Sequence, residues 1–331
     1  MKVLINHRDQ PCPLQWKKYL SLDENKVALV SFLVKEWSRP EYAASLQHRS
    51  LFVTHGNYCT KMSSTDGLSV ETSAVVELEC THEEADTRML FHAAHASSRG
   101  SRTIVIRSPD TDVAFLAVVL CQQFAQGSRM FFRTGTKHRV RYIYVFALRR
   151  KLGEQVSDAL LGLHSLTGCD STSPFKNRGK KPGLELLISN PGLCEGLQLL
   201  GQNFEMPQAL MELCERFVCL LYRSSAITDV NKLRYHIFAP KASPSDQLPP
   251  TKDALYQHVL RANYQASIWQ RALYGKPEIP SPNGHGREVT SEQHQILRIK
   301  WMTQALAPEE LLLLVNCHCR TGCTTGRCSC V

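Results

Sequence analysis

Three acidic clusters follow one another along this chain of 331 residues, and their positions constrain its fold. The first is Glu83-Glu84-Ala85-Asp86 at the start of a predicted helix, the second is Asp110-Thr111-Asp112 directly after a short apolar strand, and the third is Asp170 after a later helix. In α/β folds, the carboxyl ends of strands and the starts of helices meet at one ligand crevice. Carboxylates gathered there are the preferred ligands of hard divalent cations. The clusters therefore predict an α/β protein with a metal site.

The composition agrees with this prediction. The chain is 43% hydrophobic and 8% aromatic, which is sufficient for a buried core in two or more units. The formal net charge of +9 favours contact with a polyanion, and we expect nucleic acid, DNA rather than RNA. The longest apolar runs are shorter than the roughly 20 residues that span a bilayer, and residues 1–10 do not read as a signal peptide. We therefore expect an intracellular protein without a membrane partner, and the expected nucleic-acid substrate implies that it is nuclear.

Hydrophobic periodicity predicts the order of the elements. Helices are expected at 23–37, 85–99, 113–124 and 160–166, strands at 51–53, 74–78, 103–106, 129–132 and 141–145, and a polar loop at 61–67. Helical patterns dominate later, at 208–222, 252–260 and 265–273. The expected domains are a partial N-terminal segment (1–60), an α/β core with a parallel sheet flanked by helices (61–190), a mostly helical accessory region (191–305) and a short cysteine-rich tail (306–331).

The first acidic cluster also has a structural interpretation. Thr81 and Glu84 fit a capping box, in which the glutamate bonds back to the backbone of the cap residue. In a helix that starts at Thr81, Glu84 and Asp86 are about 200° apart and cannot share an ion. In a helix that starts near Ala85, both side chains can point inward. We favour this second geometry.

The other two clusters have structural interpretations as well. Asp110 and Asp112 fit a turn residue and the N-cap of the apolar helix that follows, and Asp170 fits an Asx turn after a helix. Acids that serve only as caps and turns would be dispersed in space. Acids gathered at one crevice repel one another unless cations neutralise them. Spatial grouping therefore separates the metal site from the structural interpretation.

The motifs resemble those of a known nuclease family. Glu84-Ala85-Asp86, Asp110-Thr111-Asp112 and Gly168-Cys169-Asp170 are similar to the Glu-x-Glu/Asp, Asp-x-Asp and Gly-Ser-Asp motifs of the flap endonuclease (XPG-like) branch of the PIN-domain nucleases, over roughly residues 70–190. A wider resemblance, to uncharacterised mobile-element-like proteins, covers most of the chain. It rests on residues 82–88, 107–113, 168–173 and 260–269.

The first resemblance implies a PIN-like parallel sheet and hydrolysis of phosphodiester bonds in nucleic acid. Two ions of Mg²⁺ or Mn²⁺ would activate water and stabilise the leaving oxygen. The residues expected to bind these ions and to be catalytic are Glu84, Asp86, Asp110, Asp112 and Asp170. The basic residues that follow have two interpretations, to which we give equal weight: they contact the phosphate backbone, or they form a solvated loop. These residues are Lys176, Arg178, Lys180 and Lys181.

One departure from the family pattern bears on activity. Flap-type nucleases begin with a strand that ends in a metal-binding aspartate, whereas residues 1–10 offer only Asp9, ahead of Pro11 and Pro13. An incomplete or degraded copy of the nuclease is therefore expected. Two hypotheses follow: a metal-dependent nuclease, and a non-catalytic nucleic-acid-binding protein derived from a mobile element. An inward-facing carboxylate from the first strand would support the nuclease, and its absence would support the binding protein.

Five of the thirteen cysteines are crowded into the last fifteen residues. Their thiolates are close enough in sequence to bind Zn²⁺, and an unfolded tail is the alternative. The spacing is similar to the first half of the tesmin/TSO1-type CXC module, a cysteine-rich DNA-binding unit, so a truncated module is expected. The expected zinc ligands are Cys317, Cys319, Cys323, Cys328 and Cys330.

Overall fold

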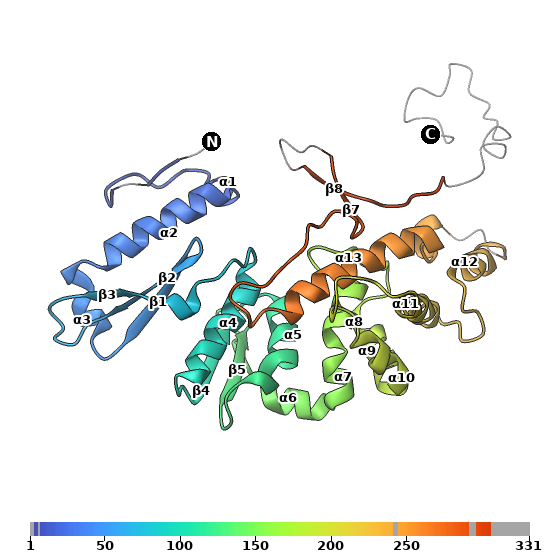
Figure 1. The fold of residues 1–331 in the computed structure, drawn as a ribbon, viewed down its shortest axis with the longest axis horizontal. Helices are drawn as coiled ribbons and strands as arrows, with labels where there is room; N and C mark the ends of the chain where they lie inside the picture. The colour runs from blue at the N-terminus through green and yellow to red at the C-terminus, as the bar shows by residue number, and fades with distance from the viewer. Residues whose placement is uncertain (1–2, 6, 241–243, 291–295, 306–331) are drawn as a thin grey trace, which may run out of the picture. The chain divides into compact units, whose positions relative to one another are not determined.

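The computed structural model describes residues 3–5, 7–240, 244–290 and 296–305 (Figure 1). The five cysteines of the tail lie outside the described residues, so zinc binding there stays a prediction. Spatial proximity divides the chain into two compact units, the first made of Met1–His164 with Ala266–Pro280 and the second of Ser165–Gln265 with Ser281–Val331. Each unit combines two separate stretches of sequence. The expected domains are continuous ranges of sequence, so these units do not test their boundaries, which stay predictions.

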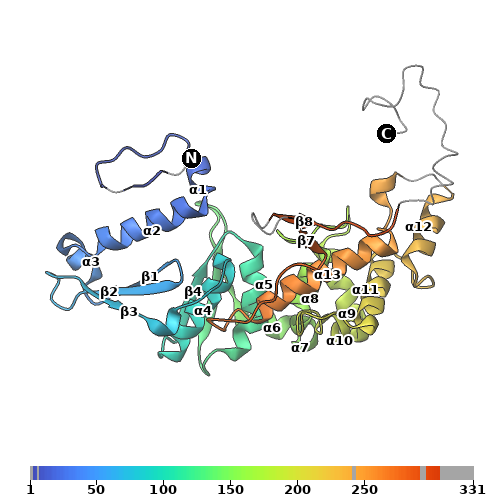
Figure 2. The ribbon, with the colours of Figure 1, turned by 45° about the horizontal axis from the view of Figure 1, so that its top comes forward.

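The first unit opens with helices packed on an antiparallel sheet. Its elements are α1 (Trp16–Leu20), α2 (Asp23–Trp37), η1 (Pro40–Tyr42), α3 (Ala43–Leu46), β1 (Ser50–His55), β2 (Tyr58–Ser63), β3 (Glu71–Ala74) and η2 (Val76–Leu78). The strand order is β1-β2-β3, and α2 lies along the sheet beside β1 (Figures 1 and 2). The helix predicted over 23–37 is confirmed, with Asp23 in the first turn, where a carboxylate is favoured by the helix dipole.

Two predictions about this sheet are wrong. Residues 61–63, expected in a loop, belong to β2, because the fully buried Met62 fixes them between β1 and β3. The strand expected at 74–78 ends at Ala74 as part of β3. The chain then forms the short 3-10 helix η2, which buries Leu78 at 1% exposure. In both cases cross-strand pairing and burial placed the boundary, not local polarity.

The candidate site is built on the next part of the first unit. Its elements are α4 (Ala85–Ser98), β4 (Thr103–Arg107), α5 (Thr111–Leu120), η3 (Cys121–Gln123), β5 (Arg129–Thr134), β6 (Arg141–Tyr144), α6 (Val145–Leu152), α7 (Glu154–Asp158) and α8 (Leu160–Thr167), whose last residues belong to the second unit. These residues confirm the α/β class. Helix α5 is buried almost all round, as its apolar sequence predicted.

The sheet in this part is mixed, not wholly parallel. Strands β4 and β5 pair in parallel, whereas β6 pairs antiparallel with β5. The connection between β5 and β6 is a short loop that turns at Gly135 (φ +99°), and a parallel crossover needs a dozen or more residues. A parallel sheet through all the strands of this part is therefore a wrong prediction for the residues that the structure describes.

The described part of the second unit is mostly helical. Its elements are α9 (Lys180–Ser189), α10 (Pro191–Leu197), α11 (Gln208–Leu221), α12 (Val230–Phe238), η4 (Ser245–Gln247), α13 (Lys252–Gln270), which ends in the first unit, and the hairpin of β7 (Arg287–Val289) and β8 (Leu297–Ile299). The two helices expected at 252–260 and 265–273 are one helix. Between them Arg261 and Asn263 are buried and hydrogen-bonded; for example, Asn263 Oδ1 accepts from the Gly201 amide at 2.9 Å. No helix in the described ranges is long and apolar enough to cross a membrane.

Candidate metal site

Three aspartates come together at the first turns of two helices. Asp86 lies in the first turn of α4, Asp110 is the N-cap of α5, and Asp112 lies in the first turn of α5. One potential ligand atom from each lies within 4.8 Å of the others. Strand β4 ends at Arg107, so the group lies at the carboxyl end of a strand, as predicted. The three aspartates could hold a metal ion.

The start of α4 decides how the first cluster is used. The helix begins at Ala85 with an extended Glu84 as its N-cap, which confirms the helix start that we favoured and excludes a capping box from Thr81. Of the two acids expected to point inward, only Asp86 belongs to the aspartate group. The Glu84 carboxylate accepts a hydrogen bond from the Trp269 indole nitrogen at 3.3 Å. Glu84 therefore anchors a buried tryptophan, while Asp86 faces the other two aspartates.

Asp110 has the structural role that the sequence left open. Its Oδ1 accepts a hydrogen bond from the Asp112 amide at 2.9 Å, which caps α5, and its own amide donates to Ser108 Oγ at 3.0 Å. A carboxylate has two oxygens and several acceptor sites, so the cap leaves capacity for a cation. The cap and the metal site are compatible, and the cap fixes the position of this carboxylate.

Asp112 is held by a histidine that the sequence analysis missed. Asp112 is only 8% exposed, and its Oδ1 lies 2.8 Å from Nε2 of the fully buried His164 on α8. The His164 ring stacks on Phe115 (centroids 4.0 Å apart) and Trp269 (5.3 Å). Because a carboxylate only accepts, Nε2 carries the hydrogen, and Nδ1 has no hydrogen-bond partner among the described residues. The sequence signal for this contact was a single histidine, His164, in an apolar helix. By itself such a histidine does not indicate which residue it contacts.

The electrostatics of this group fit a hard cation. Three carboxylates at this spacing repel one another, and the positive ends of two helix dipoles offset only part of that repulsion. A divalent cation with a preference for oxygen ligands would neutralise the rest. The arrangement also shows that these three acids are not dispersed, as caps and turns alone would require.

The third cluster belongs to the second unit. Gly168 ends α8 at φ +112°, a conformation that suits glycine, and an added Cβ would lie 2.7 Å from Pro174 Cα. Asp170 is exposed in the turn that follows, which is closed by two backbone hydrogen bonds between Cys169 and Thr172. The turn interpretation of Asp170 therefore accounts for its position, and a metal-binding role stays a prediction.

Most of the basic loop after Asp170 has partners within the second unit. Lys176 pairs with Asp246, and the Arg178 guanidinium lies over the Tyr222 ring, 5.4 Å from its centroid. Lys180 donates to the Gly168 carbonyl at 2.6 Å. Lys181 is exposed. These contacts give the loop a structural role, and its contact with nucleic acid stays a prediction.

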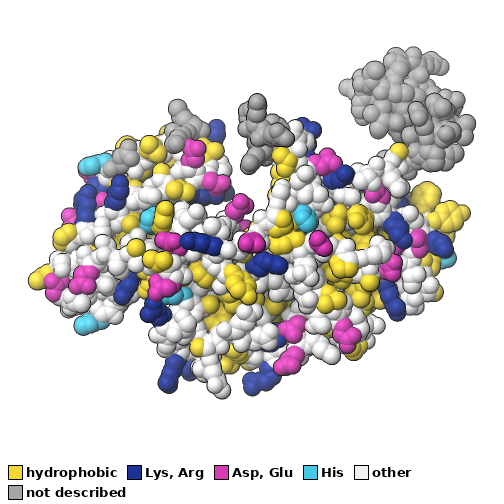
Figure 3. Space-filling model, viewed as in Figure 1, with side chains coloured by type: hydrophobic (Ala, Val, Ile, Leu, Met, Phe, Trp, Pro, Cys, Tyr) yellow, Lys and Arg dark blue, Asp and Glu magenta, His cyan; other side chains and the backbone are white. Residues whose placement is uncertain are grey.

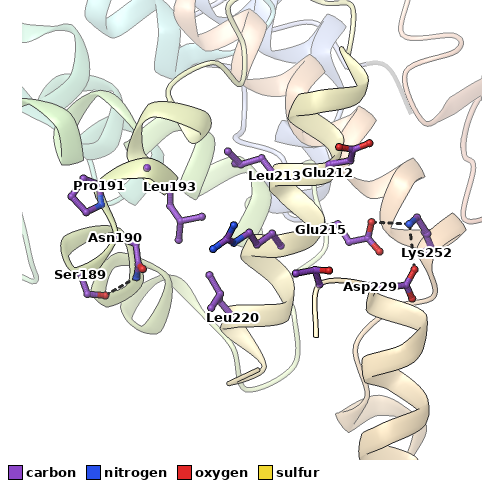
Figure 4. A pocket seen from close by; sticks show the side chains of 13 residues that line it. Ser189, Asn190, Pro191, Leu193, Glu212, Leu213, Glu215, Leu220, Asp229 and Lys252 are labelled. Carbon is purple, nitrogen blue, oxygen red and sulfur yellow. Dashed lines mark hydrogen bonds and ion pairs between the residues drawn. The ribbon is translucent and has the colours of Figure 1, made fainter. Parts of the chain in front are cut away.

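The second unit also contains a pocket of about 860 Å³ between α10, α11 and the start of α13 (Figure 4). Its buried Glu215 accepts a hydrogen bond from the Val230 amide at 2.9 Å and pairs with Lys252 at 3.0 Å. Lys252 also contacts Asp229 at 3.4 Å, and the hydrogen bond to Glu215 is the main cause of the raised pKa of Lys252. The Lys252 ammonium pairs with both carboxylates, and these contacts tie α11, α12 and α13 together. These contacts give the three charged residues a structural role.

No family model, no curated protein and no solved structure matches this chain. Its class therefore rests on its own geometry. The described residues define an α/β protein in which Asp86, Asp110 and Asp112 could hold a metal ion.

Proposed function

We propose that this protein is a metal-dependent nuclease that hydrolyses phosphodiester bonds in nucleic acid. The observation that carries the proposal is the grouping of Asp86, Asp110 and Asp112 at the end of β4. The net charge of +9 supports a polyanionic substrate, and the motif resemblance to PIN-domain nucleases supports the reaction. A PIN-like architecture is part of the proposal. The parallel β4–β5 pair agrees with it, and the antiparallel β6 departs from it.

The donor set favours Mg²⁺ or Mn²⁺ over a softer metal, because all three ligands are carboxylates. When bound, such an ion supplies Lewis acidity to a phosphodiester. The protein's own contribution is to hold the ligands in place. The helix cap fixes Asp110, and His164 fixes Asp112 at a position that is closed to most solvent.

A non-catalytic nucleic-acid-binding protein is the second candidate, and one observation favours it. Asp9 is exposed and lies 3.3 Å from His7 in a turn, and β1, the first strand, contains no carboxylate. Among the described residues, the acidic group thus has three members, and none comes from a strand. By resemblance, the first-strand aspartate of the nuclease family has no counterpart in these residues.

Cleavage of labelled single-stranded DNA, flap DNA and RNA with Mn²⁺ or with EDTA tests the proposal. We expect the unaltered chain to cleave only with metal. Asp86→Asn and Asp112→Asn should each lose at least about 100-fold in rate, since loss of a mere supporting residue already costs 10- to 100-fold. Glu83→Gln is the matched control, because Glu83 is exposed, adjacent and outside the group.

Binding without cleavage would refute the nuclease proposal and support a non-catalytic nucleic-acid-binding protein. Cleavage that survives in both asparagine variants would exclude these carboxylates from the reaction. If the chain neither binds nor cleaves any of the three substrates, both candidate functions are wrong.

A further inference from the structure

The mixed sheet of β4, β5 and β6 has one face packed into the core and one face turned away from it. On β4, Ile104 is buried at 8% exposure, whereas the next residue, Val105, is 50% exposed. On β5, Phe132 is buried at 4% exposure, and its neighbour Phe131 pairs with Val105. Successive strand residues point to opposite faces, so the partners of Val105 across the sheet share its outward face. This open face of the sheet carries the inference below.

Two rows of side chains cross this open face. Backbone register places Val105, Phe131 and Tyr144 in one row, and Arg107, Arg133 and Tyr142 in the next row. We call these six residues the arginine–aromatic face. The rows lie two residues apart along each strand, which is about 7 Å.

The two tyrosines of this face are exposed to solvent. Tyr142 is 59% exposed and Tyr144 is 37% exposed. Tyr144 stacks on Phe131, with ring centroids 5.1 Å apart and ring planes inclined at 29°. Large exposed aromatic groups gathered on one sheet face are typical of an interaction surface.

The charge of this face has a single sign. Strands β4, β5 and β6 contain four arginines and no aspartate or glutamate. Arg107 and Arg133 are direct cross-strand neighbours, and like charges in that position destabilise a sheet. Neither forms an ion pair with an acidic residue in the part of the chain that the structure describes. The Arg133 guanidinium lies over the Tyr142 ring, 5.8 Å from its centroid, and its buried Nε has no hydrogen-bond partner among the described residues.

Figure 3 shows Lys and Arg side chains interspersed with Asp and Glu over the side of the molecule that it presents. The loop after β5 adds the exposed residues Lys137 and Arg139 to the same sheet. The positive charge of the arginine–aromatic face is therefore complementary to an anionic ligand.

We propose that the arginine–aromatic face binds single-stranded nucleic acid. Bases stack on Tyr142 and Tyr144, and phosphates pair with Arg107 and Arg133. A single strand offers the flat faces of its bases, whereas a duplex hides them in its stack. Charge complementarity favours a polyanion, and the exposed rings favour a polyanion that carries aromatic bases over an acidic peptide.

The face also adjoins the candidate metal site. Arg107 is the last residue of β4, and Asp110 follows three residues later. The inference deepens the proposed function, since it rests on the same nucleic-acid ligand and assigns it a surface. A failure of the binding surface can be distinguished from a failure of the nuclease proposal, because binding is measured in EDTA and cleavage is measured with Mn²⁺.

Fluorescence anisotropy of a labelled 20-nucleotide strand with the full chain, in EDTA, tests this face. DNA and RNA strands, a duplex of the same length and polyglutamate are compared. We expect Tyr142→Ala to weaken single-strand binding by about 5- to 150-fold, because the variant loses the stacking of one base. Tyr142→Phe, which keeps the ring, should bind like the unaltered chain. Tyr235→Ala is the control for loss of an exposed ring, because Tyr235 is 73% exposed on α12.

The arginines are tested through salt dependence. Arg107→Gln should reduce the slope of log affinity against log salt by about 0.7, the value for one phosphate contact to a single strand. Arg150→Gln, an exposed arginine on α6, is the control. Thermal unfolding checks that each variant is folded.

Three results would each overturn the inference: unchanged binding by Tyr142→Ala, an unchanged slope for Arg107→Gln, or a duplex bound as tightly as the single strand. Polyglutamate that displaces the strand equally from the unaltered chain and Tyr142→Ala would show an acidic-protein surface instead.

Discussion

Replacing Asp110 by asparagine separates the two roles of this side chain. Asparagine caps helices about as well as aspartate, so Asp110→Asn keeps the hydrogen bond from the Asp112 amide. The change removes one of the three neighbouring negative charges. Stability without metal and affinity for metal should therefore move in opposite directions.

The size of the effect follows from the spacing of the carboxylates. Their ligand atoms lie within 4.8 Å of one another. Two unit charges at that separation repel by about 3 kcal/mol at an effective dielectric constant of about 20, and by about 1 kcal/mol at about 60. Asp110 is only half-buried, so the lower value applies to each of its two pairs. Loss of a charge at the start of a helix costs about 0.3 to 1 kcal/mol in the other direction.

We therefore expect Asp110→Asn to raise the free energy of unfolding of the first unit by about 1 to 2 kcal/mol in EDTA, a rise in Tm of about 2 to 8 °C for a unit of this size. With Mn²⁺ at 100 times its Kd, the unaltered chain should gain about 2.7 kcal/mol, because the ion binds only the folded state. The variant should gain far less. Thermal unfolding followed by circular dichroism in the two buffers measures both changes.

Asp229→Asn is the matched control. Asp229 is the N-cap of α12 and accepts from the Lys232 amide at 2.9 Å, but its second oxygen lies 3.4 Å from Lys252 Nζ instead of facing other carboxylates. This variant should lose stability and leave the response to Mn²⁺ unchanged. The reasoning is refuted if Asp110→Asn also loses stability in EDTA, or keeps the full response to Mn²⁺.

Two further predictions concern buried histidines. His164→Ala removes a ring that stacks on Phe115 and Trp269, and it also removes the hydrogen-bond donor to the buried Asp112 carboxylate. The variant should therefore lower the free energy of unfolding, measured by urea denaturation, by about 2 to 4 kcal/mol. A loss of less than about 1 kcal/mol would contradict this packing. Burial lowers the pKa of His258 from 6.5 to about 4, so between these values the unfolded state binds a proton that the folded state does not. Stability should fall by about 3 kcal/mol as the pH drops from 6.5 to 4 and be insensitive to this group above 6.5. His258→Gln should flatten that slope, and an equal slope in both proteins would count against it.

Features governed by neighbouring residues could be read from the sequence. The all-round burial of α5 followed from its run of apolar residues. The start of α4 at Ala85 is the favoured one of the two starts that the sequence left open. Strands β4 and β5 also agree with the predicted positions. In each case the hydrophobic pattern and the turn residues act within a few positions of the element that they specify.

Features governed by distant partners could not be read in this way. The direction of β6 depends on the length of the loop before it and on its pairing with β5, and the continuity of α13 depends on partners for Arg261 and Asn263 elsewhere in the second unit. A local hydrophobic pattern predicts the end of a buried helix where polar residues interrupt it. Tertiary hydrogen bonds satisfy them and allow the helix to continue.

The candidate site shows the same division. The sequence by itself determined that acidic residues occur at the starts of α4 and α5, since cap and strand-end positions are local properties. Only the tertiary structure decided that Asp86 joins Asp110 and Asp112, that Glu84 binds Trp269 instead, and that His164, 52 residues from Asp112, supports its carboxylate. Such contacts depend on how helices pack against one another, which no short window of sequence contains.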